Sequence, residues 1–115
     1  MDMKVDFLVL PNGKTPVEDF LNDLDDKTLA KVYRLVEILE QDGSLPFPHA
    51  RKMQGYARLW ELRVLSPRGA VRVFYVYIEK NRIVFVSGFI KKTQKTPIRE
   101  IERALNYLYQ AGMKL

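Results

Sequence analysis

The first half of the chain has the hydrophobic pattern of one β-strand followed by two α-helices. Apolar and polar residues alternate over 3–9, as in a half-buried strand, and a Pro-Asn-Gly turn follows. A capping box with proline at the first helical position predicts a short helix over 16–22. Apolar residues then recur at helical spacing, which predicts a second helix from Asp25 or Asp26 that ends before Gly43.

The second half has the pattern of a small sheet and a closing helix. A proline-broken loop over 44–49 leads from the helices to the sheet. The apolar period then changes to two, which predicts strands over 59–65, 70–78 and 83–90. Because only short turns separate them, these strands are expected to form an antiparallel meander. A last helix is expected over 97–111, between a Thr-Pro pair and a glycine.

These elements predict an α+β fold in one domain, 1–115. The expected architecture is an antiparallel sheet in the order β-α-α-β-β-β-α, packed against helices, with the two acidic helices covering one face. Arg63 and Arg72 fall on neighbouring strands, with parity opposite to Leu62 and Val73. Phe74 shares the parity of Arg72, but Arg72 stands at the start of its strand and is expected to escape burial. Its removal is therefore expected to change stability by no more than about 0.5 kcal/mol.

Composition removes several classes of chemistry. The chain has 115 residues, 47% of them apolar, no cysteine and one histidine. Disulfide scaffolds, thiolate metal sites and cysteine nucleophiles are excluded, and a multi-histidine metal cluster lacks ligands. The single His49 lies in the proline-broken loop, where a structural or solvated role is favoured over catalysis. No secretory or membrane-spanning segment is present, so we expect a cytoplasmic protein that does not contact a membrane.

Charge is distributed unevenly along the chain. Residues 1–50 carry five basic and ten acidic residues, whereas residues 51–99 carry twelve basic residues against two acidic ones, a net charge of +10. One interpretation is that the basic strands merely alternate outward into solvent. The favoured one is that this part of the fold faces a polyanion, because a solvated face usually mixes both signs.

The sequence also contains candidates for a catalytic and RNA-binding surface. The proposed catalytic group is cationic and consists of Arg63, Arg72, Lys91, Lys92 and Lys95. Guanidinium groups bind phosphate oxygens bidentately and ammonium groups act as point charges. Further candidates for RNA contact are Arg51, Lys52, Tyr56, Arg58, Arg68 and Arg82. Aromatic residues interleaved with these cations offer surfaces for base stacking, although core packing is the alternative for Trp60 and Phe89. Paired carboxylates lie on predicted helices, and no metal or cofactor motif is present.

Several segments together resemble one known family. The pieces are Lys-Met-Gln-Gly-Tyr at 52–56, Leu-Trp-Glu-Leu-Arg at 59–63, Arg-Val-Phe-Tyr at 72–75 and Gly-Phe-Ile-Lys-Lys-Thr-Gln-Lys-Thr-Pro at 88–97. In this order they resemble the toxins of the RelE/ParE superfamily, most closely the phage-derived, HigB-like branch. The resemblance covers about residues 3–110.

The resemblance implies a RelE-like fold and the toxin of a type II toxin–antitoxin pair. RelE and HigB toxins bind the ribosome and cut mRNA, so the implied partners are ribosome, mRNA and a cognate antitoxin, expected to be a helix-turn-helix protein. The implied roles place Arg72 on the scissile phosphate and Arg63 beside it, with Lys91, Lys92 or Lys95 as phosphate clamp or proton carrier. No cofactor and no metal are required.

One departure concerns the general acid or base. Many relatives carry a tyrosine or histidine near a short C-terminus, whereas a whole helix follows Pro97 here and offers only Tyr107 and Tyr109. Two other functions remain open. A ParE-like gyrase inhibitor would not need the Arg63 and Arg72 pair, and a non-catalytic RNA-binding accessory protein would bind RNA without cleaving it.

Overall fold

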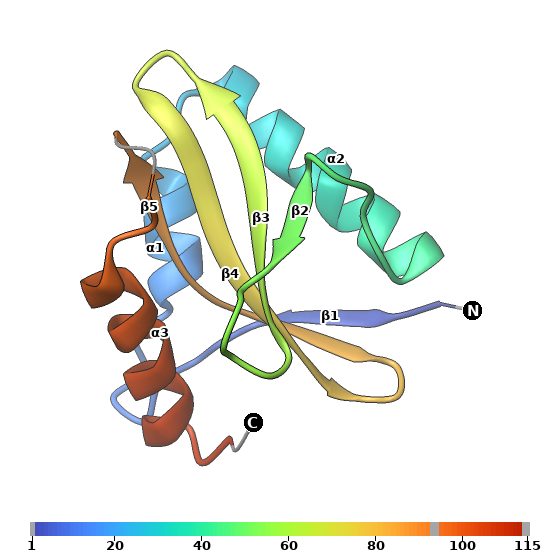
Figure 1. Ribbon diagram of the computed structural model, residues 1–115, viewed down its shortest axis with the longest axis vertical. Helices are drawn as coiled ribbons and strands as arrows, with labels where there is room; N and C mark the ends of the chain where they lie inside the picture. The colour runs from blue at the N-terminus through green and yellow to red at the C-terminus, as the bar shows by residue number, and fades with distance from the viewer. Residues whose placement is uncertain (1, 93–94, 114–115) are drawn as a thin grey trace.

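The computed structural model describes residues 2–92 and 95–113, and its centre is a twisted sheet (Figure 1). The elements run in the order β1 (Lys4–Phe7), α1 (Pro16–Asn22), α2 (Asp26–Asp42), β2 (Ala50–Lys52), β3 (Leu59–Ser66), β4 (Gly69–Glu79), β5 (Arg82–Lys91) and α3 (Ile98–Gln110). The sheet has five strands in the order β1-β5-β4-β3-β2. The α+β fold class and the meander of β3, β4 and β5 are therefore confirmed.

The sheet differs from the prediction at its two edges. β1 is shorter than the alternating pattern over 3–9 and pairs with β5 in parallel, so the sheet is mixed rather than purely antiparallel. β2 was not predicted, because three residues are too few to show an alternating pattern. It pairs antiparallel with β3 and places Arg51 opposite Glu61.

The helices end where the local sequence requires. Asp25 caps α2 by accepting a hydrogen bond of 3.0 Å from the backbone N–H of Thr28 and one of 2.7 Å from its hydroxyl. Gly43 ends α2 in the left-handed conformation with φ of 81°, which a residue with a Cβ adopts only with strain. In the described residues, no helix combines the length and the apolar character needed to cross a membrane.

Both faces of the sheet carry apolar clusters. One cluster joins α1 and α2 to residues such as Leu62, Val73 and Phe85. The other joins α3 to Phe74, Val76 and neighbouring residues on the opposite face. The central strands β4 and β5 are apolar on both sides because helices cover both sides.

Candidate functional site: a cationic recess beside α3

The face of the sheet on which α3 packs also contains a recess of about 460 Å³, which lies beyond the helix. We call it the cationic recess and define it by its lining residues, Phe47, Pro48, Arg51, Glu61, Arg63, Ala70, Arg72, Lys91 and Lys92. Among these described residues, five are basic and one is acidic. The uneven charge seen in the sequence is therefore concentrated in one concave surface, which favours an anionic ligand.

Strand register brings these side chains together. Arg63 on β3 lies directly opposite Arg72 on β4. Lys91 on β5 lies opposite Ala70, two positions before Arg72 on β4, and Arg51 on β2 lies opposite Glu61. Because side chains alternate across a strand, all of them project from the same face of the sheet. Four strands thus contribute charge to one surface.

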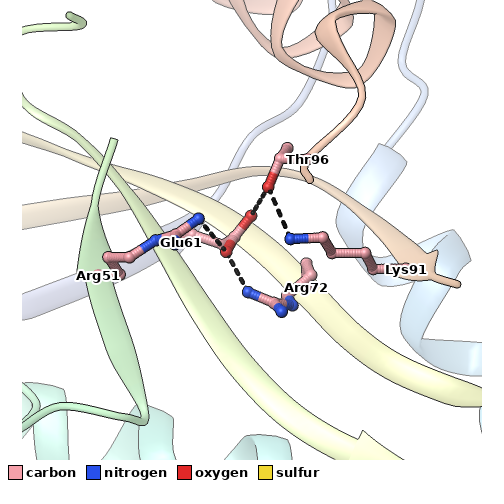
Figure 2. A network of polar contacts seen from close by, with 5 residues as sticks. All are labelled: Arg51, Glu61, Arg72, Lys91 and Thr96. Atoms are coloured by element: carbon pink, nitrogen blue, oxygen red, sulfur yellow. Dashed lines mark hydrogen bonds and ion pairs between the residues drawn. The ribbon is translucent and has the colours of Figure 1, made fainter. Parts of the chain in front are cut away.

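A buried carboxylate lies at the centre of this surface (Figure 2). The Glu61 side chain is fully buried, and its Oε1 accepts a hydrogen bond from Nη1 of Arg72. The same oxygen lies 3.8 Å from Nη2 of Arg51, whose side chain is about half exposed. Its Oε2 accepts a hydrogen bond of 2.9 Å from the hydroxyl of Thr96. The charge of Glu61 compensates the cations nearest to it, and its buried oxygens have partners.

Arg72 is buried, which contradicts the expectation that it escapes into solvent. Its residue is only 7% exposed, because Phe74 and Phe89 beside it belong to the cluster under α3. Glu61 makes this burial tolerable, since an unpaired buried guanidinium is very costly. The Nε of Arg72 is itself buried and has no partner among the described atoms. This N–H is therefore an unsatisfied buried donor, which costs folding free energy.

Lys91 is the second buried cation of the recess. Its Nζ donates a hydrogen bond of 3.4 Å to the hydroxyl of Thr96, and the residue is 5% exposed. Burial lowers the pKa of the Lys91 ammonium below its ordinary value, and the nearby Arg72 charge lowers it further, while Glu61 opposes the change. A lysine with a lowered pKa gives up its proton more readily than an ordinary lysine and is a candidate for proton transfer.

The predicted catalytic group divides between two adjacent depressions. Arg63, Arg72, Lys91 and Lys92 line the cationic recess. Lys95 lines a neighbouring depression together with Lys52, and Arg51 and Thr96 contribute to its wall as well. Thr93 and Gln94, which belong to the motif that carries the resemblance, lie outside the described residues.

The predicted RNA-contact residues are more dispersed. Arg51 lines the recess, and Lys52 lies beside it on β2. Tyr56 packs against the cluster under α3, and Arg58 is exposed in the loop before β3. Two others lie outside the recess lining and have carboxylate partners of their own, Arg68 with Asp23 at 3.7 Å and Arg82 with Asp6 at 3.0 Å.

The aromatic residues of the strands serve the core. Tyr75 is fully buried, and Trp60 stacks on it with ring centroids 6.4 Å apart, on the face that α1 and α2 cover. The hydroxyl of Tyr77 donates a hydrogen bond to the carbonyl of Gly43. Phe89 is buried under α3. The hypothesis that these rings stack on bases is wrong for Tyr75, which is fully buried. It is unsupported for Trp60 and Tyr77, whose rings pack against Tyr75. The alternative of core packing holds for Trp60 and Phe89.

Glu61 and Thr96 are the residues that sequence reasoning missed. Glu61 is one of two acidic residues in the basic segment and shares the parity of Arg63, which was the available signal. Thr96 precedes α3 and was interpreted only as part of a helix start. Tyr107 and Tyr109 do not belong to the described lining of the recess, and Tyr109 is 81% exposed.

Comparisons with known proteins place this geometry in context. Residues 19–108 match the model of a family described as phage-derived protein Gp49-like. The fold is similar to that of the E. coli toxin RelE, solved as a double arginine-to-alanine mutant in the free state. The TM-score is 0.65 and the identity 12%, over 92% of this chain and 97% of that chain. No curated protein matches the chain. The RelE-like fold predicted from sequence is confirmed.

Proposed function

The chain belongs to the Gp49-like family of phage-derived proteins, and from this premise and the cationic recess we propose that it is the toxin of a type II toxin–antitoxin pair that cleaves mRNA on the ribosome. RelE, whose fold it shares, is a toxin. The observation that supports nuclease activity is that one recess contains both a buried guanidinium, Arg72, and a buried lysine of lowered pKa, Lys91. The ribosome and mRNA are included in the proposal because the sequence resembles RelE and HigB toxins.

The proposed reaction is the attack of an RNA 2′-hydroxyl on its own 3′-phosphate. The 2′-oxygen loses its proton to a base and bonds to phosphorus, the bond from phosphorus to the 5′-oxygen breaks, and that oxygen takes up a proton. The products are a 2′,3′-cyclic phosphate and a 5′-hydroxyl. Negative charge builds up on the phosphoryl oxygens in the transition state, and fixed cations stabilise it.

Each cation then has a role that matches its surroundings. Arg72 contacts the scissile phosphate through donors that Glu61 does not occupy, because Glu61 is bonded to Nη1 alone. Arg63, directly opposite, binds the same phosphate from β3. Lys91 carries the proton to the leaving 5′-oxygen, since its lowered pKa makes it a stronger acid than an ordinary lysine. The exposed Lys92 and Lys95 bind the flanking phosphates.

The proposed partner is a cognate antitoxin that covers the basic face of the sheet. An acidic partner is complementary to the cationic recess and would associate quickly at low salt. By the same contact it would exclude RNA from the recess or hold the toxin away from the ribosome.

The test is induced expression of the chain without its antitoxin, followed by mapping of mRNA 5′ ends. We expect growth arrest, intact DNA and new 5′ ends within translated reading frames. Accumulation of DNA breaks with unchanged mRNA would indicate a gyrase inhibitor instead. Binding of RNA that depends on salt, with no cleavage even on translating ribosomes, would indicate a non-catalytic RNA-binding protein.

A further inference from the structure

The role of Glu61 goes beyond balancing charge. We propose that Glu61 is a positioning residue that holds the guanidinium of Arg72 directly and the ammonium of Lys91 through the hydroxyl of Thr96 (Figure 2). The two buried cations are thereby kept in one fixed arrangement at the recess. The inference rests on the proposed function only in naming the anion that enters the recess, an RNA phosphate.

The hydroxyl of Thr96 can link the two charges in only one direction. An ammonium group has only donors and a carboxylate only acceptors. The hydroxyl must therefore accept from Nζ of Lys91, at 3.4 Å, and donate its single proton to Oε2 of Glu61, at 2.9 Å. This fixed polarity couples the position of Lys91 on β5 to that of Glu61 on β3.

Glu61 suits positioning better than proton transfer. Oε1 is occupied by Arg72 and faces Arg51, and Oε2 is occupied by Thr96. The side chain is fully buried, so a substrate hydroxyl has no approach to an uncommitted oxygen. Arg72 on β4 and Arg51 on β2 lie directly against this carboxylate, and Lys91 on β5 is linked to it through Thr96, which makes Glu61 the common support of the site.

The arrangement makes the protonation of Lys91 depend on Glu61. The charged groups that act on Lys91 are Arg72 from β4, Glu61 and Arg63 from β3, and Arg51 from β2. Glu61 is the one carboxylate among them and favours the ammonium, whereas the three guanidinium groups disfavour it. Removal of its charge must therefore lower the pKa of Lys91 further.

Side-chain NMR of isotopically labelled lysine tests this directly. The pKa of Lys91 is titrated in the full-length wild-type protein and in Glu61→Gln, Thr96→Val and the control Glu37→Gln, which changes an exposed glutamate of α2. We expect Glu61→Gln to lower the pKa of Lys91 by about half a unit or more. We expect a smaller decrease in Thr96→Val, because only the link is lost, and no change in Glu37→Gln.

An unchanged pKa of Lys91 in folded Glu61→Gln would overturn the proposal. If Glu61→Gln does not fold, Thr96→Val decides, since it keeps the pair of Glu61 and Arg72, and an unchanged pKa there would refute the coupling. In cleavage assays, the alkaline limb of the kcat/KM profile should move to lower pH in Glu61→Gln. The titrations need no RNA, so absence of cleavage by the wild-type protein would contradict the proposed function and leave the positioning result standing.

Discussion

Arg63 and Arg72 lie directly opposite each other on β3 and β4, yet only Arg72 is ion-paired with a carboxylate among the described residues. Arg72 is buried on Glu61, whereas Arg63 is half-buried and lines the recess. Two like charges at opposed positions repel each other. Glu61 compensates the charge of Arg72. The charge of Arg63 is then the one that a bound anion would compensate.

The two arginines should therefore differ in their contribution to stability. Arg72→Ala leaves the fully buried Glu61 with the hydroxyl of Thr96 and, as its ion-pair partner, only Arg51 at 3.8 Å, and we expect a loss of about 3 kcal/mol in the free energy of unfolding. Arg63→Ala should change it by less than about 1 kcal/mol, because a repulsive neighbour is removed. Urea unfolding of the two variants measures both values, and equal losses would contradict the assignment of Glu61 to Arg72.

The lowered pKa of Lys91 predicts how stability changes with pH. The native protein releases the Lys91 proton at lower pH than the unfolded chain does, whose ordinary value is 10.5. Between these two values the unfolded chain binds more protons, so the contribution of Lys91 to the free energy of unfolding rises with pH. Urea unfolding between about pH 7 and about pH 10 should show the wild type gaining stability relative to Lys91→Met. A constant difference would show that Lys91 has the same pKa in both states.

Elements with a long, clear period could be predicted from sequence, and β2 could not. The helical spacing before Gly43 gave α2 within a residue or so of its observed bounds, because the cap, the apolar stripe and the terminal glycine agree. The three residues of β2 are too few to show an alternation of apolar and polar residues, and they form a strand only because β3 pairs with them. The parallel pairing of β1 with β5 likewise depends on tertiary structure.

The opposed arginines of the site could be predicted, but not their burial. Parity and neighbouring strands suffice to bring Arg63 and Arg72 together. Burial of Arg72 depends on α3, which covers the neighbouring Phe89. It also depends on Glu61, which is placed next to Arg72 only by the register of β3 and β4. A sequence pattern assigns a charged residue to a face but does not show whether a distant helix covers it.

The packing of α1 on the sheet depends on the absence of a side chain at Gly88. A Cβ added there would overlap the ring of Phe20 from α1. We expect Gly88→Ala to destabilise the fold by about 1–3 kcal/mol through overpacking. Thermal unfolding measures the loss, and Phe20→Leu in the same chain should restore part of it by removing the overlapping ring atoms. Full stability of Gly88→Ala alone would show that the ring moves aside without cost.

The proposed acidic antitoxin predicts binding that weakens with salt. The five basic residues of the cationic recess attract such a partner, and at about 0.1 M salt this attraction is largely screened beyond about 10 Å. We expect the association rate to fall steeply as the salt concentration rises, whereas the dissociation rate changes little. Stopped-flow or surface measurements give both rates. An association rate that is independent of salt would contradict docking on this surface.

The most specific prediction concerns the geometry of the Arg72 side chain rather than its charge. Arg72→Lys keeps a cation beside Glu61, so the protein should remain folded, but it loses the planar pair of guanidinium donors. We expect cleavage of ribosome-bound mRNA to fall by about 10²-fold, on the scale of one lost transition-state donor. Arg34→Lys, at an exposed arginine of α2 that belongs to neither the catalytic nor the RNA-contact candidates, is the matched control and should cleave normally. Cleavage by folded Arg72→Lys at the wild-type rate would remove Arg72 from the scissile phosphate.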